Sequence, residues 1–143
     1  MIQFILVQNK QGKTRIEKWF IQCKNEEKKK IKTEVHTLVL SRTQSYHTNF
    51  VEYQEYRIVY RRYAGLYFCF CVDSSDNLLA YMESIHLFVE VLDKFFGNVT
   101  ELDLVFSFFK VYAVIDEMFL AGEIEETSRE NIIHRIDMLE KME

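Results

Sequence analysis

The chain has 143 residues, no proline, 48% hydrophobic and 15% aromatic residues, and a formal net charge of −4. This composition excludes an intrinsically disordered protein, and the length fits one domain with a core of ordinary size. We therefore expect a single domain over residues 1–143, without a flexible linker.

Several features predict a cytosolic protein. No uncharged apolar run approaches the 18 or so residues that a membrane-spanning helix needs. The opening residues 1–7 lack the cationic segment and cleavage site of a signal peptide. The three cysteines are an odd number, which argues against a disulfide framework.

Charge is distributed unevenly along the chain. Residues 1–32 hold nine Lys and Arg against three Asp and Glu, whereas residues 111–143 hold three against nine. The basic end is suited to an acidic peptide, a phospholipid headgroup or an acidic partner, whereas the run 28–32 taken alone is better explained as a solvated basic face. The excess is modest and no nucleic-acid motif accompanies it, so we expect no nucleic-acid partner.

The first half of the chain predicts a hairpin followed by a helix. Apolar residues fill 2–7, turn residues occupy 9–12, and alternation resumes over 14–20, with Arg15 beside the turn. Asn25 is a helix-capping residue followed by two acidic residues, which favour the positive end of a helix dipole. Ile31, Val35 and Val39 then repeat at helical spacing, which indicates one buried and one solvated face.

After a polar connection at 41–48, three short strands are predicted at 50–53, 56–61 and 66–72. Residues 63–72 carry no charge, so this strand should be covered on both faces. Gly65 is suited to the bend before it. Cys69 and Cys71 lie on one strand face, and without a second cysteine pair we interpret them as buried thiols. Together the segments predict a five-stranded, mainly antiparallel sheet in an α+β fold.

Two helices, 78–96 and 102–120, carry only narrow polar stripes and are otherwise apolar. Helices of this kind are buried, so the sheet should cover one side and another protein the other. A last helix should begin at Thr127 with a capping box that ends at Glu130, and carry Ile132, Ile136 and Leu139 on one face. The excess of apolar surface predicts a permanent subunit of a larger assembly.

No enzyme chemistry is indicated. Gly12-Lys13-Thr14 resembles the end of a phosphate-binding loop, but that loop needs a glycine at position 7, where Val7 stands. Asp103, Asp116 and Glu117 fit a solvated helix stripe better than a catalytic site, since no histidine or serine completes one. We expect no catalytic residue, no metal and no cofactor.

Five segments resemble a known family, the small (sigma) subunits of clathrin adaptor complexes. They are MIQFILVQNKQGKTR at 1–15, YRRYAGLYF at 60–68, IHLFVEVLD at 85–93, ELDLVF at 101–106 and DEMFLAGEI at 116–124. Within the family, HTNFVE at 47–52 and AGL at 64–66 look more like the plasma-membrane type than the Golgi and endosomal type. The resemblance implies a longin-like fold, a five-stranded sheet flanked by helices with additional C-terminal helices.

It also implies partners and a location. Family members form a heterotetramer with two large chains and a medium chain, and one large chain, of the alpha type, is the main partner. The assembled complex contacts the cytosolic face of the plasma membrane at clathrin-coated pits, where it acts in endocytosis. The plasma-membrane type binds the acidic dileucine signal in cargo tails: an acidic residue, three arbitrary residues, then two bulky aliphatic ones.

The resemblance carries over to particular residues. Arg15 matches the basic residue that faces the acidic position of the signal. The matching dileucine pocket consists of Ala64, Leu66, Val89, Asn98, Val99 and Leu104. Thr100 stands beside the pocket where the family usually has Cys. Three alternatives stay open: a sigma subunit of a Golgi or endosomal complex, a structural brace without cargo binding, and a small subunit of another coat or tethering complex.

Overall fold

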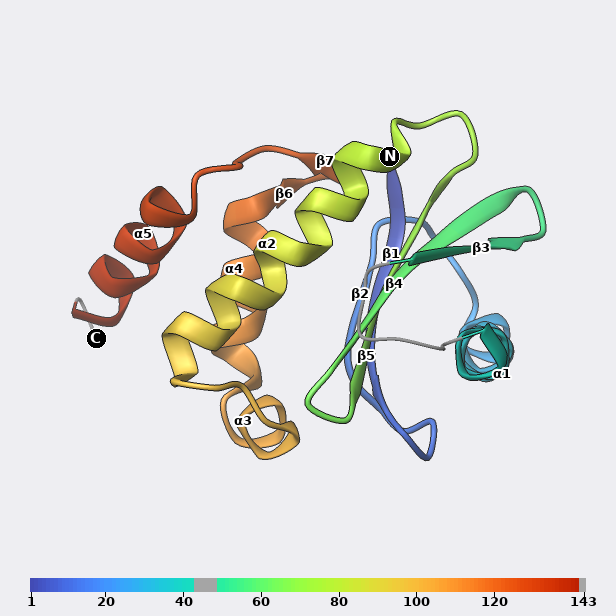
Figure 1. Cartoon of the computed structure of the whole chain (residues 1–143), viewed down its shortest axis with the longest axis horizontal. Coiled ribbons are helices and arrows are strands. Elements are labelled where there is room, and N and C mark those ends of the chain that lie inside the picture. Colours follow the sequence, from blue (N-terminus) through green and yellow to red (C-terminus); the bar gives the residue numbers. More distant parts are fainter. Residues whose placement is uncertain (43–48, 142–143) are drawn as a thin grey trace.

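The computed structural model of the chain describes residues 1–42 and 49–141 (Figure 1). In chain order its elements are β1 (Ile2–Asn9), β2 (Thr14–Trp19), α1 (Asn25–Arg42), β3 (Asn49–Tyr53), β4 (Tyr56–Tyr63), β5 (Leu66–Asp73), α2 (Leu78–Phe96), α3 (Glu101–Phe106), α4 (Phe108–Met118), β6 (Phe119–Leu120), β7 (Glu123–Ile124) and α5 (Arg129–Lys141). Most of the connection predicted at 41–48 lies outside the described residues, and α1 continues through Arg42.

The five-stranded sheet predicted from the sequence is confirmed. Its strand order is β2-β1-β5-β4-β3, and every neighbouring pair is antiparallel. All eight residues of β1 are buried, because this strand lies between β2 and β5 with side chains packed on both faces. The smaller strands β6 and β7 form a separate two-stranded ribbon.

Helices cover both faces of the sheet. In Figure 1, α1 lies on one side, and α2, α4 and α5 lie on the other. Strand β5 contributes to both cores. Tyr67, Cys69 and Cys71 pack on the α1 side, and the alternate residues Phe68 and Phe70 pack under α2. This confirms the prediction that the uncharged strand is covered on both faces.

The two strand cysteines are buried thiols, as expected. Cys69 and Cys71 lie on one face, free of any disulfide. Burial raises the pKa of Cys71 to about 12 and raises that of Cys69 further, so both thiols stay protonated at neutral pH. They act as small apolar side chains in the α1 core.

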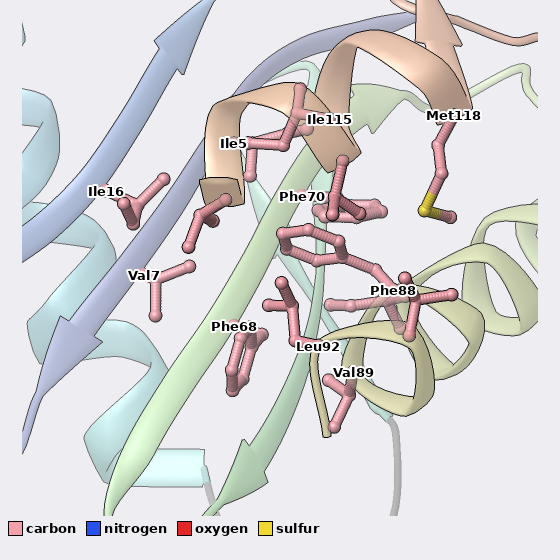
Figure 2. Close-up of a cluster of buried hydrophobic side chains, with 14 of the residues drawn as sticks. Ile5, Val7, Ile16, Phe68, Phe70, Phe88, Val89, Leu92, Ile115 and Met118 are labelled. Atoms are coloured by element: carbon pink, nitrogen blue, oxygen red, sulfur yellow. The ribbon is translucent and has the colours of Figure 1, made fainter. Parts of the chain in front are cut away.

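Aromatic side chains join α2 to the sheet. The ring of Phe88 lies 6.0 Å from those of both Phe68 and Phe70, and Phe119 lies 5.4 Å from Phe70. Figure 2 shows Phe88 pointing from α2 toward the strand, with Leu92 beside it. These contacts fix α2, and with it the candidate site at its C-terminal end.

The prediction of one helix over 102–120 is wrong. The chain forms α3 and α4 separately, with Ser107 between them at φ −123° and ψ 37°. The break has a packing reason, since Leu104 on α3 and Val111, Val114 and Ile115 on α4 are all fully buried. A change of axis at Ser107 allows both groups to point into the core. Phe119 then leaves the helix to form β6.

The N-terminal cap of the last helix also differs from the prediction. Helix α5 begins at Arg129, and the Ser128 hydroxyl accepts a hydrogen bond from the Asn131 backbone N–H. Glu126 accepts hydrogen bonds from the backbone N–H groups of Thr127 and Ser128. A serine one position later than expected therefore caps the helix. Ile132 and Ile136 are buried as predicted, and the side chain predicted at Leu139 lies outside those described.

The expectation that α2 needs a second protein for its outer side is also wrong. The sheet covers one side of α2, and α4 and α5 pack against the helix on the other (Figure 1). The apolar positions of α2 are buried or partly buried within the chain, except for Leu79 in its first turn, which is exposed. The unpartnered apolar surface lies on α3 and the start of α4 instead.

Candidate functional site

The predicted site residues gather at the end of the sheet where the β1–β2 and β4–β5 turns lie. Helix α3 lies at this same end (Figure 1). Leu66 pairs with Asn9 in the β1–β5 ladder, and the Asn9 side chain donates to Glu101 of α3 at 3.1 Å. Arg15 of β2 contacts the same carboxylate. Residues far apart in the sequence are thus connected by direct contacts.

The four apolar residues of the predicted pocket form part of the core. Leu66, Val89, Val99 and Leu104 are each at most 1% exposed and belong to one buried cluster. Figure 2 shows Val89 close to Leu92 on the sheet side of α2. The side chains fill the space between them in this structure. The cluster is closed to solvent in this structure.

Ala64 and Asn98 differ from the other four, because both are exposed and both have left-handed backbone conformations. Ala64 has φ 53° in the β4–β5 turn, and Asn98 has φ 80° just after the end of α2. Such conformations cost energy for residues other than glycine, and they are concentrated at functional sites. Gly97 at φ 62° caps α2, so two consecutive residues turn the chain sharply toward α3.

Asp93 connects three segments of the site, a role that the sequence analysis missed. Its Oδ1 atom accepts a hydrogen bond from the Tyr63 hydroxyl at 2.7 Å and from the Val99 backbone N–H at 3.0 Å. The hydrogen bond to Asp93 raises the pKa of Tyr63. One carboxylate thereby holds the β4–β5 turn and the α2–α3 joint against the end of α2. On the sequence alone, Asp93 fits an ordinary solvated stripe.

Arg15 is already paired in this structure. Its Nε and Nη2 atoms each lie 3.0 Å from Oε2 of Glu101, the first residue of α3. Hydrogen bonds from Asn9 and Arg15 hold the pKa of the Glu101 carboxyl below its usual range. The Arg15 side chain as a whole stays 31% exposed, so solvent reaches it. Glu101 is the second functional candidate that sequence reasoning missed.

Thr100 has a clear structural role. Its hydroxyl oxygen accepts a hydrogen bond from the Asp103 backbone N–H at 3.4 Å, and the Asp103 carboxylate accepts one from the Thr100 backbone N–H at 2.9 Å. This reciprocal capping box satisfies the first free N–H groups of α3. A threonine caps a helix better than an apolar residue does, so Thr100 fixes the start of the helix that contributes Leu104.

An exposed apolar surface adjoins the site. We call it the α3–α4 surface, and it consists of Leu102 (65% exposed), Val105 (41%), Phe106 (75%), Phe108 (52%) and Phe109 (54%). Single exposed apolar side chains are ordinary, but large ones clustered on consecutive helical turns mark an interaction surface. Helices α3 and α4 therefore carry apolar side chains on two sides, one that faces the core and one that faces solvent.

Other features of the described residues do not bear on this site. Two hollows lie elsewhere, one beside Trp19 and the start of α1, the other between α2 and the segment after β7. No group of acidic, histidine or cysteine side chains in the described ranges could hold a metal ion. Within these ranges no helix has the length and apolarity needed to cross a bilayer.

The sheet order and the helices on both faces define a longin-like chain of mixed α/β class. Comparison with known sequences identifies the family within this fold class. The family described as "Clathrin adaptor complex small chain" matches residues 1–143, and the chain belongs to this family.

Three relatives show the range of similarity. The "AP-2 complex subunit sigma" of Neurospora crassa is 62% identical over 143 residues, covering both chains completely. The human "AP-1 complex subunit sigma-3" is 45% identical over 145 residues, covering 99% of this chain and 94% of that one. A chain in the "Homology model of the full-length AP-3 complex in a stretched open conformation" is 30% identical with a TM-score of 0.78, covering 99% and 95%.

Proposed function

We propose that this chain is the small subunit of a plasma-membrane clathrin adaptor complex and binds the acidic dileucine signals of membrane cargo. Higher identity to the AP-2 relative than to the AP-1 relative favours the plasma-membrane type over the Golgi and endosomal type. The subunit would act in endocytosis on the cytosolic side of coated pits, as a binding and structural subunit without enzymatic activity. It would reach the membrane only through the assembled complex.

One observation carries the cargo-binding proposal. An accessible arginine, Arg15, lies at the same end of the sheet as a cluster of buried aliphatic side chains and two exposed turns. An extended peptide advances about 3.3 Å per residue, so its acidic residue and its first leucine lie roughly 13 Å apart. Such a peptide would contact different elements at its two ends. Arg15 on β2 would contact the acidic residue, and the aliphatic cluster between β5, α2 and α3 would contact the two leucines.

The energetics favour weak, reversible binding of a single signal. Burying two leucine side chains contributes on the order of 1.5 to 3 kcal/mol each. Opening the closed cluster and ordering the peptide both cost free energy, and these costs offset much of the gain from burial. An exposed ion pair at Arg15 adds roughly 1 kcal/mol or less, so it contributes more to selectivity than to strength. Firm capture of cargo would therefore require several contacts on one membrane.

Replacement of Arg15 tests the proposal directly. In the assembled complex, Arg15→Ser should weaken binding of an acidic dileucine peptide by up to about fivefold, because it removes one exposed ion pair. Fluorescence anisotropy with a labelled peptide measures the change. Co-purification of the other subunits should be unaffected, since Arg15 does not lie on the α3–α4 surface.

The matched control is Arg57→Ser. Arg57 also has its Nε 3.0 Å from a glutamate, Glu52, but it lies on β4, beside the opposite edge of the sheet. This variant should bind the peptide as the wild type does. Equal peptide affinity of Arg15→Ser and wild type would count against a role for Arg15. Failure of the wild-type complex to bind the peptide at all would favour the alternative of a structural brace.

The α3–α4 surface supports the assignment of a permanent partner. We infer that a large, alpha-type adaptor chain covers it, and that the second large chain and the medium chain complete the complex. Obligate interfaces resemble a protein core divided in two, and aromatic residues are enriched in them. Phe106, Phe108 and Phe109 give the α3–α4 surface this character.

A further inference from the structure

The acidic partner of Arg15 occupies the position that a cargo carboxylate would take. Oε2 of Glu101 accepts two hydrogen bonds, from Nε of Arg15 and from the side-chain amide of Asn9, and Nη2 of Arg15 lies 3.0 Å from the same oxygen in an ion pair. Donors from two strands, β1 and β2, thus converge on a single oxygen atom at the start of α3. A carboxylate of a bound peptide would require the same guanidinium donors.

The ion pair is open to exchange. The side chains of Arg15 and Glu101 are 31% and 36% exposed, so solvent reaches both. Pairs of this kind are weak because water and salt screen them, and a second carboxylate of equal charge replaces the first at little cost. The positive charge of Arg15 is paired with a carboxylate both before the exchange, by Glu101, and after it, by the peptide.

Glu101 is also positioned to couple the two ends of the signal. Leu104 follows it by three residues on α3, and its side chain lies in the closed aliphatic cluster. Residues three apart on a helix share a face. Loss of the Arg15 contact would remove one tether of the first turn of α3, which the Asn9 hydrogen bond and the capping box of Thr100 still hold.

We propose that Glu101 is an internal competitor of the cargo acidic residue, holding Arg15 until a peptide carboxylate displaces it. This inference rests on the proposed cargo binding. Glu101 then lowers the affinity for acidic peptides and leaves peptides with a neutral residue at that position unaffected. It is a specificity-determining residue, because it sets how strongly the complex favours a charged over an uncharged signal.

The test compares two labelled peptides on the assembled complex at about 0.1 M ionic strength. One carries Glu at the acidic position of a dileucine signal, and the other carries Gln there. Glu101→Gln should tighten binding of the Glu peptide about three- to fivefold and change binding of the Gln peptide less than twofold. In an Arg15→Ser background, the gain from Glu101→Gln should fall below about twofold.

Glu52→Gln is the matched control, because it removes the same charge from an arginine-paired carboxylate at the far edge of the sheet. It should leave the affinity for both peptides unchanged. The inference is overturned if Arg15→Ser weakens binding of the Glu peptide while Glu101→Gln does not tighten it. The proposed function itself fails if the wild-type complex binds neither peptide, whatever the effect of Glu101→Gln, so the two failures are distinguishable.

Discussion

Val89→Asp is expected to prevent this chain from accumulating in a folded, soluble complex. Val89 is 1% exposed within the cluster that joins α2 to the sheet (Figure 2). A carboxylate there has no partner, and an uncompensated buried charge costs roughly 3 to 5 kcal/mol. That penalty reaches the lower end of the range of stabilities found for single domains. Soluble yield on co-expression with the partner chains and thermal unfolding of the complex measure the effect.

Leu79→Asp is the matched control in the same helix. Leu79 is 70% exposed in the first turn of α2, where an acidic residue also suits the helix dipole. It should leave yield and unfolding temperature unchanged. Normal yield and unfolding of Val89→Asp would contradict the buried position of Val89. A loss of peptide binding in this variant would reflect unfolding, so Arg15→Ser is the better probe of the site.

Phe106→Asp is expected to abolish co-purification with the large chain while leaving the fold of the subunit intact. Phe106 is 75% exposed, the most exposed residue of the α3–α4 surface. Because its side chain packs little within the chain, the substitution should cost the subunit itself little. In the complex it replaces an aromatic contact with a charge that must be desolvated. We expect at least a roughly 100-fold loss of affinity.

Leu79→Asp serves again as the control, since Leu79 is about equally exposed but lies outside the α3–α4 surface. Affinity capture through a tagged large chain gives the readout. Retention of the large chain by Phe106→Asp at the wild-type level would show that another face is covered. Loss of the large chain in both variants would show that exposed apolar residues in general, and not this surface, support assembly.

The sheet could be predicted from the sequence because its strands carry strong local signals. The uncharged run that ends at Val72, the turn at Gly65, the hairpin near Gly12 and the short segments 50–53 and 56–61 together give all five strands to within a few residues. Side chains alternate between the two faces of a strand, so the sequence also predicts that Tyr67, Cys69 and Cys71 share one face of β5. In the structure all three pack under α1. In these segments the local pattern and the tertiary packing agree.

The break at Ser107 could not be predicted, because periodicity alone does not distinguish one buried helix from two short helices at an angle. An apolar pattern with a narrow polar stripe fits a helix that is covered all round. In the structure, the inward side chains of α3 and α4 reach the core and the others are exposed. The excess of apolar residues did correctly indicate an uncovered surface, but it placed part of that surface on α2.

The polar side chains that organise the site act over long sequence separations. Asp93 binds Tyr63 across 30 residues, and Glu101 binds Arg15 across 86. No local pattern identifies either pair, and each carboxylate alone is typical of a solvated helix. The aliphatic residues of the predicted pocket do converge in one cluster, and the structure adds that this cluster is closed.

A photo-cross-linking measurement tests the central claim most directly. An acidic dileucine peptide would carry a photoactivatable leucine analogue at the first leucine position, and cross-linked residues in the assembled complex would be mapped by mass spectrometry. We predict cross-links within 64–66, 89–92 and 98–104 of this chain, weakened by excess unlabelled peptide. Cross-links that fall only on other subunits, or only on other parts of this chain, would contradict the account.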